Sequence, residues 1–290
     1  VSEQDIGKNV EKTGKYYIKI GEFGDIWDGW YTLNGKKIRV AIKQLRGAPA
    51  HNKKLISQLR RQLFTAGRNW RLLVHPNVCN FYGLCFDYGY LPALVVQFHE
   101  NGNVMEYLQN AQEKTVPQPN RLMLILDVSN GLEYLHSQSI VHGDVRGFNI
   151  LVTDSGHACL TDFGLILIID NAEFTRHKLA GPARWSAPEI LDPPEDMLGR
   201  VPYSKMTDMF AFAMTCVELA TLAVPFSERK NDSAVIMHVL NDGRPELPPL
   251  LAEHEQIAGV IRHCWSRDPE QRPSASHVHA VFQKLFEESK

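Results

Sequence analysis

Three side chains with hard oxygen atoms occur close together in the middle of the chain, at Asp144, Asn149 and Asp162. Asn149 and Asp162 offer the kind of ligand that Mg²⁺ takes when it keeps several waters and shares its shell with phosphates. Asp144 is then left as a candidate base. Because the triplet Asp-Phe-Gly that begins at Asp162 is common by chance, and equally fits a β-turn between buried strands, the interpretation depends on the neighbouring segments.

A glycine-rich hairpin and a strand lysine precede these residues. The segment from Tyr16 to Leu33 places β-branched and aromatic residues around Gly21 and Gly24, and KKIRVAIKQL follows, so both are predicted to be strands joined into hairpins. The glycines would let backbone N–H groups approach a phosphate without an intervening Cβ, although a plain hairpin turn would also contain them. Lys43 shares its strand face with Ala41.

Helical spacing of apolar residues predicts the elements that carry the remaining motifs. A helix is expected over about His51 to Leu73. An amphipathic helix is expected over Arg121 to Ser137, with six inward residues: Leu122, Ile125, Leu126, Val128, Leu132 and Leu135. The segment from Thr207 to Ala220 is apolar nearly all round and is predicted to be a buried helix.

In chain order these pieces resemble the motifs of eukaryotic protein kinases. The segment from His142 to Asn149 is similar to the catalytic loop H-R-D-x-x-x-x-N, and Asp162 begins the D-F-G triplet. Lys19 stands at the first glycine position of the G-x-G-x-x-G-x-V loop. Further matches are Gly21, Gly24 and Ile26 of that loop, the V-A-I-K strand at 40–43, H-P-N at 75–77, A-P-E at 187–189 and DPEQRPS at 268–274.

This resemblance covers about residues 16 to 286 and implies the fold. The expected class is α+β: a two-lobed protein kinase fold with a small, mainly β N-lobe that carries one αC helix and a larger, mainly α C-lobe. One kinase domain over 1–290 is expected, with the N-lobe at about 16–96, the hinge at 97–102 and the C-lobe at 103–286. Arg184-Trp185 and Cys264-Trp265 are similar to the tyrosine-kinase-like branch.

The resemblance also implies contacts within the C-lobe. Asp208 matches the αF aspartate that holds the backbone of the catalytic loop, and Arg272 is expected to pair with Glu189. The apolar run from Leu165 to Ile169 is expected to form a short helix under a displaced αC.

The implied activity is transfer of the γ-phosphoryl group of ATP to serine or threonine hydroxyls of proteins, and tyrosine stays an alternative acceptor. Asp144 would take the hydroxyl proton, Asn149 and Asp162 would hold Mg²⁺, and Lys43 would contact the α- and β-phosphates. The expected nucleotide contacts are Ile20, Gly21, Gly24, Ile26, Ala41, Lys43, Val96, Gln97, Phe98, His99 and Leu151.

One departure from the family pattern affects the expected rate. Ala66 stands where kinases carry the αC glutamate, and no acidic residue occurs from Gly29 to Phe86. Gln62 or Asp162 would then engage Lys43 instead. Losing the ion pair could slow transfer roughly 10²- to 10³-fold, about 2.7 to 4 kcal/mol. The sequence therefore predicts a weak or conditionally active kinase, and the alternative is a nucleotide-binding pseudokinase that acts as a scaffold or allosteric partner.

A second departure concerns regulation. Gly143 replaces the arginine that precedes the catalytic aspartate and that normally reads a phosphate on the activation segment. Phosphorylation of Thr175 is therefore not expected to be the main switch.

Composition and charge narrow the partners. The five cysteines show no metal-binding spacing and indicate reduced thiols, no apolar run approaches the roughly 20 residues of a membrane span, and a cytoplasmic location is expected. Gly29 to Phe86 carries eleven lysines and arginines, whereas the chain after Phe86 has 16 against 27 acidic residues. The expected partners are a protein substrate, ATP and a regulatory protein at the αC face. Nucleic acid or anionic lipid on the basic lobe is a third, disfavoured alternative.

Overall fold

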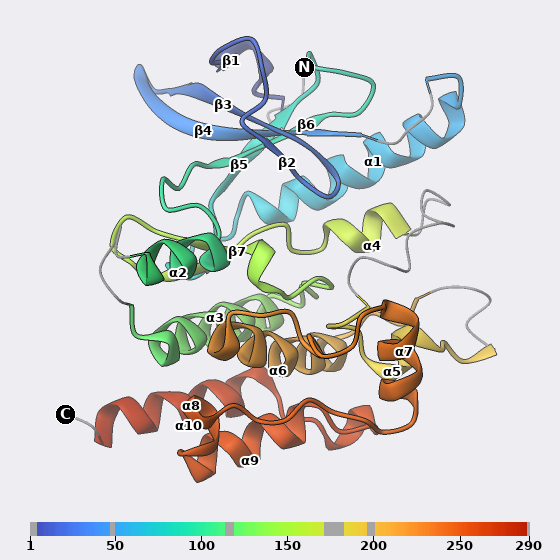
Figure 1. Ribbon diagram of the computed structural model, residues 1–290. Coiled ribbons are helices and arrows are strands. Elements are labelled where there is room, and N and C mark those ends of the chain that lie inside the picture. Colours follow the sequence, from blue (N-terminus) through green and yellow to red (C-terminus); the bar gives the residue numbers. More distant parts are fainter. Residues whose placement is uncertain (1–4, 47–49, 114–118, 171–182, 196–200, 289–290) are drawn as a thin grey trace. The chain divides into compact units, whose positions relative to one another are not determined.

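The computed structural model describes residues 5–46, 50–113, 119–170, 183–195 and 201–288, and Figure 1 shows their helices and strands. The chain divides into two compact units, one made of Val1–His99 with Ile168–Phe174 and the other of Glu100–Leu167 with Thr175–Lys290. The first unit contains a sheet and one long helix, and the second is mainly helical. The predicted α+β class, with a β-rich part followed by a helical part, is confirmed.

The first unit contains an antiparallel sheet in the strand order β1-β3-β4-β6-β5, and the short β2 pairs along β3. Its strands are β1 Val10–Lys12, β2 Lys19–Ile20, β3 Gly24–Leu33, β4 Lys36–Leu45, β5 Phe81–Cys85 and β6 Ala93–Gln97. Asn34 and Gly35 both have positive φ and join β3 to β4 as a two-residue hairpin, which is the geometry that an Asn-Gly pair favours. The predicted hairpins are confirmed.

The segment before the glycine-rich hairpin is part of this unit's core. Ile6 and Val10 are buried in one apolar cluster with residues of β4 and β6. The Lys12 ammonium lies 3.9 Å from the ring centre of Trp27 and 4.4 Å from that of Tyr88, at cation–π distance. Burial lowers the pKa of Lys12. The N-terminal segment is therefore held by apolar burial at one end and by two aromatic rings at the other.

The helix α1 (Lys53–Trp70) follows the sheet hairpin. It begins after Asn52, whose side chain accepts a hydrogen bond from the Leu55 backbone N–H at 3.1 Å. Its apolar face, with Leu59, Leu63 and Trp70, is buried, and the Trp70 ring meets the Phe81 ring of β5 edge-on at 5.6 Å. The predicted helix over about His51 to Leu73 is confirmed, with slightly shorter ends.

The second unit holds a two-stranded sheet and the remaining helices of the described residues. Its strands are β7 Ile150–Val152 and β8 Ala158–Leu160, and its helices are α2 Val104–Gln112, α3 Arg121–Ser137, α5 Pro188–Leu191, α6 Lys205–Thr221, α7 Asp232–Leu240, α8 Pro249–Ala252, α9 Glu255–Cys264 and α10 Ala275–Glu288. Within the described ranges, no helix is both long and apolar enough to cross a bilayer.

The two long helices of this unit differ from each other in how well the sequence predicts their burial. α6 is buried along almost its whole length, as predicted. α3 has the predicted bounds and five of its six predicted inward residues are buried, but Leu126 is only half-buried, and Leu124, Asp127, Ser129 and His136 are buried as well, so the single inward face is wrong. The physical reason is that α3 packs against α6, α10 and β8, so it is covered on several sides.

The apolar run after the Asp-Phe-Gly triplet forms a helix, α4 (Leu165–Asp170). Leu165, Ile166, Ile168 and Ile169 are all buried. The predicted short helix is confirmed, and its expected place under a displaced αC stays a prediction.

Candidate active site

The catalytic-loop backbone is fixed by a carboxylate of α6. Asp208, which is 1% exposed, accepts hydrogen bonds from the backbone N–H groups of His142 at 2.8 Å and Gly143 at 2.7 Å. Its Oδ2 also lies 2.8 Å from His136 Nε2. Hydrogen bonds that involve an ionised partner are the strong ones, so Asp208 holds the loop firmly. The role expected for Asp208 is confirmed.

Two further α6 side chains anchor the same loop, and sequence reasoning missed both. Thr215 Oγ1 donates to the Val145 carbonyl at 3.0 Å. Glu218 Oε2 accepts from the Gly147 N–H at 2.8 Å and from the Trp185 indole N–H at 2.9 Å. A signal for them exists: they follow Asp208 by seven and ten residues, so these polar groups share one face of a helix that is otherwise apolar.

The loop's own side chains surround the candidate base. Arg146 Nε lies 2.9 Å from Asp144 Oδ1, and Asn149 Nδ2 donates to Asp144 Oδ2 at 2.6 Å. The pKa of Asp144 is raised to about 7, mainly by burial; the Asn149 hydrogen bond lowers it and the neighbouring carboxylates add to the rise. The contact with the Arg146 guanidinium also favours the charged form. A carboxyl that titrates near neutral pH is suited to accept a proton.

The donor set of the second unit fits Mg²⁺. Because Asn149 Nδ2 donates to both Asp144 Oδ2 and the Asp144 carbonyl, its Oδ1 is left as an acceptor on the opposite side of the amide. The Asp162 carboxylate belongs to a half-buried residue. Among the residues that the structure describes, no group of three or more histidines, cysteines or acids could hold a metal. The oxygen atoms of Asn149 and Asp162 are of the type that Mg²⁺ takes when phosphates and waters complete its shell.

Asp162 has an unusual backbone conformation. Its φ is +61°, in the left-handed region that residues other than glycine rarely adopt. Gly164, two residues later, donates its N–H to the His142 carbonyl at 2.8 Å, which ties the triplet to the catalytic loop. Backbone strain of this kind concentrates at functional sites.

Gly143 stands where the family has arginine, and the structure gives a physical reason for glycine. Its φ is +80°, and a Cβ at this position would lie 2.6 Å from Leu167 Cδ1 and 2.7 Å from Ile166 Cγ2. The helix α4 therefore occupies the space that any side chain at this position would need. The absence of a side chain at position 143 therefore leaves the space in which α4 packs.

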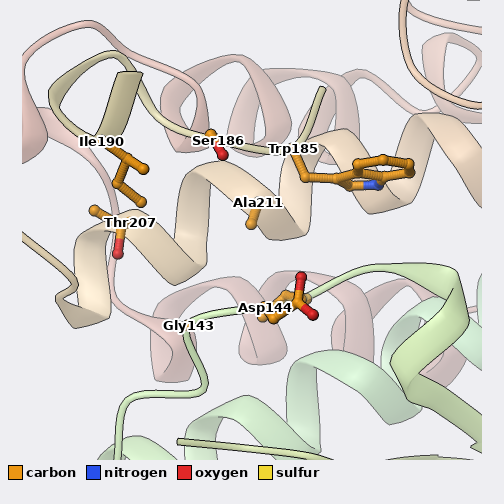
Figure 2. Close-up of a pocket in the computed structure, with 8 residues that line it drawn as sticks. Gly143, Asp144, Trp185, Ser186, Ile190, Thr207 and Ala211 are labelled. Atoms are coloured by element: carbon orange, nitrogen blue, oxygen red, sulfur yellow. The ribbon is translucent and has the colours of Figure 1, made fainter. Parts of the chain in front are cut away.

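A small cavity adjoins the base (Figure 2). It is lined by Gly143 and Asp144 on the loop, by Trp185 and Ser186 before α5, and by side chains of α5 and α6. Its volume is about 20 Å³, enough for one water molecule and too small for an amino-acid side chain.

A buried ion pair ties the A-P-E segment to the end of the chain. Arg272 donates to both oxygens of Glu189, at 2.6 and 2.9 Å. The same guanidinium donates to the carbonyls of Met206 and Ser266. The predicted pair is confirmed, and its bidentate geometry is the strong form of an arginine–carboxylate contact.

Four of the predicted nucleotide contacts of the first unit, Ile26, Ala41, Lys43 and Val96, lie on one face of its sheet, whereas the register of Gln97 with Val40 places Gln97 on the other face. Strand register places Ile26 opposite Lys43 and Ala41 opposite Val96, and cross-strand partners point to the same side. Lys43 is 9% exposed. Val40 and Ile42 point to the other face, into the apolar core.

The remaining predicted contacts have varied surroundings. Ile20 is exposed, Gln97 and Phe98 are half-buried and His99 is buried, and the guanidinium of Arg39 stacks over the Phe98 ring at 4.0 Å. In the second unit, Leu151 lies in the middle of β7 and is half-buried.

The glycines of the hairpin turn are required by the sheet itself. Gly21 donates its N–H to the Gly24 carbonyl at 2.8 Å. A Cβ on Gly24 would lie 2.3 Å from the Gln44 carbonyl oxygen of β4. Close packing between strands is therefore reason enough for glycine at 24, whatever ligand the loop covers.

One of the two substitutes expected for the missing glutamate is wrong. Gln62 Oε1 is buried and, among the described residues, has no hydrogen-bond partner, so it does not accept a hydrogen bond from Lys43. Ala66, one turn later, is half-buried. The pairing of Lys43 with Asp162 stays a prediction. Thr175 lies outside the described residues.

Comparison with known proteins identifies the family of this chain. The family model for protein tyrosine and serine/threonine kinases matches residues 14–282. The serine/threonine/tyrosine-protein kinase HT1 of Arabidopsis thaliana is 29% identical over 267 residues, which are 92% of this chain and 64% of that protein. Protein sevenless of Drosophila melanogaster is 30% identical over 278 residues, which are 89% of this chain and 10% of that protein.

A third relative is the serine/threonine-protein kinase TNNI3K of Mus musculus, which is 29% identical over 266 residues, 90% of this chain and 30% of that protein. The chain thus spans less than two thirds of the length of each of these relatives. The family model covers nearly the whole chain, and the motifs lie in the fold that the family requires. The relatives HT1 and TNNI3K support the tyrosine-kinase-like branch, and the chain belongs to the protein tyrosine and serine/threonine kinase family.

Proposed function

We propose that this chain transfers the γ-phosphoryl group of ATP to serine or threonine hydroxyls of proteins, with tyrosine as a further acceptor, and that it does so slowly or conditionally. The observation that carries the proposal is the catalytic loop, in which Arg146 and Asn149 contact the Asp144 carboxylate while α6 ties the backbone at three places. Phosphoryl transfer depends mainly on positioning and on charge neutralisation, which a rigid polar loop supplies.

In the proposed reaction the substrate hydroxyl oxygen forms a bond to the γ-phosphorus, the bond from that phosphorus to ADP breaks, and the hydroxyl proton passes to Asp144. Asn149 and Asp162 would hold Mg²⁺, which neutralises phosphate charge when bound. Lys43 would contact the α- and β-phosphates. Ile26, Ala41 and Val96 share its sheet face and would contact the nucleotide, with Ile20, Gly21, Gly24, Gln97, Phe98, His99 and Leu151 as further contacts.

The acceptor, the domain extent and the location belong to the same proposal. Serine or threonine is supported by the names of two relatives, and a single kinase domain over 1–290 by the reach of the family match. A cytoplasmic location is supported only by cysteine usage, since all five cysteines are buried and none forms a disulfide. Low activity is supported by Ala66, which stands where the family carries the αC glutamate. A regulatory protein that binds α1 would offset the loss of that glutamate.

The test measures thermal stabilisation by ATP with and without Mg²⁺, together with transfer of radiolabelled phosphate, for the native chain and for Asp144→Asn. Stabilisation and transfer that disappears in the variant would establish the kinase activity. Stabilisation without transfer in either protein would indicate the nucleotide-binding pseudokinase instead. Equal transfer by both proteins would exclude Asp144 as the base.

A further inference from the structure

One arginine of the first unit contacts the glycine-rich turn at three points. Arg46 directly follows β4, and its Nη2 donates to the Gly21 carbonyl at 2.8 Å. Its Nη1 lies 3.3 Å from Asp25 Oδ1, and its backbone N–H donates to the Phe23 carbonyl at 2.9 Å. Arg46 thus holds the turn near its beginning, in its middle and at its end.

Two of these contacts orient backbone groups that lie outside the strand pairing. Residues 21–23 lie between β2 and β3. A loop that binds a phosphate presents its backbone N–H groups to the ligand, so its carbonyl oxygens, which carry partial negative charge, have to point elsewhere. Arg46 supplies a donor for the Gly21 carbonyl and another for the Phe23 carbonyl, and it therefore favours that orientation.

The third contact places Arg46 on the face of the sheet opposite Lys43. Register pairs Ile26 with Lys43, and successive residues of a strand point to opposite faces, so Asp25 points away from the Lys43 side. The Arg46 guanidinium lies against Asp25 and therefore on that opposite side. The face that carries Lys43 is left to the phosphates, and Arg46 can orient the turn without competing for them.

We propose that Arg46 and Asp25 form a clip that positions the glycine-rich turn for the phosphates of the nucleotide. The inference rests on the proposed function, because ATP is the ligand that this turn would cover. Arg46 is a positioning residue, since it acts through the backbone of the turn. Loss of the clip should weaken the binding of ATP and leave the binding of adenosine, which has no phosphate, unchanged.

The test measures the dissociation constants of ATP and adenosine by isothermal titration calorimetry for the native chain and for Arg46→Met. One exposed ion pair and one hydrogen bond from a charged donor should contribute about three- to tenfold to ATP affinity, and adenosine affinity should change by less than about twofold. The matched control is Lys37→Met, which breaks another exposed ion pair of the same sheet, with Glu11 at 3.3 Å, and should change neither affinity by more than about twofold.

The variant Asp25→Asn separates a clip from a simple attraction between charges. If Arg46 only attracted phosphate through its charge, removal of the Asp25 carboxylate would tighten ATP binding. A clip needs that carboxylate, so Asp25→Asn should weaken ATP binding by about twofold or more, and the double variant should lose about as much as Arg46→Met alone. Tighter ATP binding by Asp25→Asn would overturn the proposal, as would equal losses of ATP and adenosine affinity in Arg46→Met.

Hydrogen exchange of the nucleotide-free chain distinguishes failure of the clip from failure of the proposed function. The backbone amides of residues 22–24 should exchange faster in Arg46→Met than in the native chain, and at the native rate in Lys37→Met. A native chain that bound no ATP would refute the proposed function, whereas faster exchange would still show that Arg46 holds the turn. Normal ATP binding with unchanged exchange in Arg46→Met would overturn the clip alone.

Discussion

Replacing Arg146 with glutamine removes the positive charge that lies against the Asp144 carboxylate, with 2.9 Å between Nε and Oδ1. An opposite charge in contact lowers the pKa of an acid by about 1 to 3 units. The pKa of Asp144 is about 7 in the native chain, so we expect roughly 8 to 10 in Arg146→Gln. At pH 7 the ionised fraction would fall from about one half to between roughly one tenth and one thousandth.

The direct assay is NMR titration of the Asp144 carboxyl carbon in protein labelled at aspartate, because it reads the pKa without requiring activity. If the chain transfers phosphate, the rate of Arg146→Gln at pH 7 should fall with the ionised fraction and recover at alkaline pH. The matched control is Arg146→Lys, which keeps a positive charge and should keep the midpoint near the native value. A midpoint that does not rise in the glutamine variant would refute the reasoning.

The same titration affects stability, and its sign can be worked out. The pKa of Asp144 is raised from 3.8 in the unfolded chain to about 7 in the folded one, so the folded state binds more protons between these values. The free energy of unfolding therefore falls as pH rises through this window, by about 4 kcal/mol in all. In Asp144→Asn this contribution to the pH dependence should be absent from urea denaturation curves.

Three further substitutions test the site. Asp208→Asn should lower the free energy of unfolding by about 2 to 3 kcal/mol, because an amide donor replaces one acceptor of the loop N–H groups; a loss under about 0.5 kcal/mol in urea denaturation would contradict the anchoring role. Gly143→Ala should cost about 1 to 3 kcal/mol in the same assay through its positive φ and the contact with α4, and an unchanged midpoint would argue against that contact. Ala66→Glu should speed phosphate transfer roughly tenfold or more by pairing with Lys43, whereas Thr65→Glu, an added charge on the exposed side, should not. Equal rates for the last two variants would count against the missing glutamate as the cause of slow transfer.

Local patterns in the sequence were enough to predict α1, α3, α4 and α6, the hairpins and the motif order. Asp208 and the Glu189–Arg272 pair were also predictable, because their places in the family pattern name their partners. Glu218 was not, since its partners Gly147 and Trp185 lie 71 and 33 residues away along the chain, and the polar face of α6 becomes meaningful only when the loop lies against it.

The errors share a physical cause. Whether Gln62 reaches Lys43 depends on how α1 is rotated about its own axis relative to β4. The spacing of apolar residues predicts this rotation too coarsely to place a single side-chain atom. The burial of α3 on several sides depends on which elements pack around it. Gly143 was recognised only as a lost arginine, because its positive φ and the nearness of α4 arise from tertiary structure.

The short strands β1 and β2 also protect the outer edge of β3 from pairing with another molecule. Without β1 and β2, the ten-residue strand β3 would present its outer edge unpaired, which is a template for pairing with another molecule. β1 covers Gly29 to Tyr31 of that edge, and β2 covers Asp25 and Ile26. The edge that remains belongs to two short, separate strands. A protein shortened to begin at Tyr16 would uncover the edge of β3 from Gly29 to Tyr31, so its self-association should rise even where the fold survives.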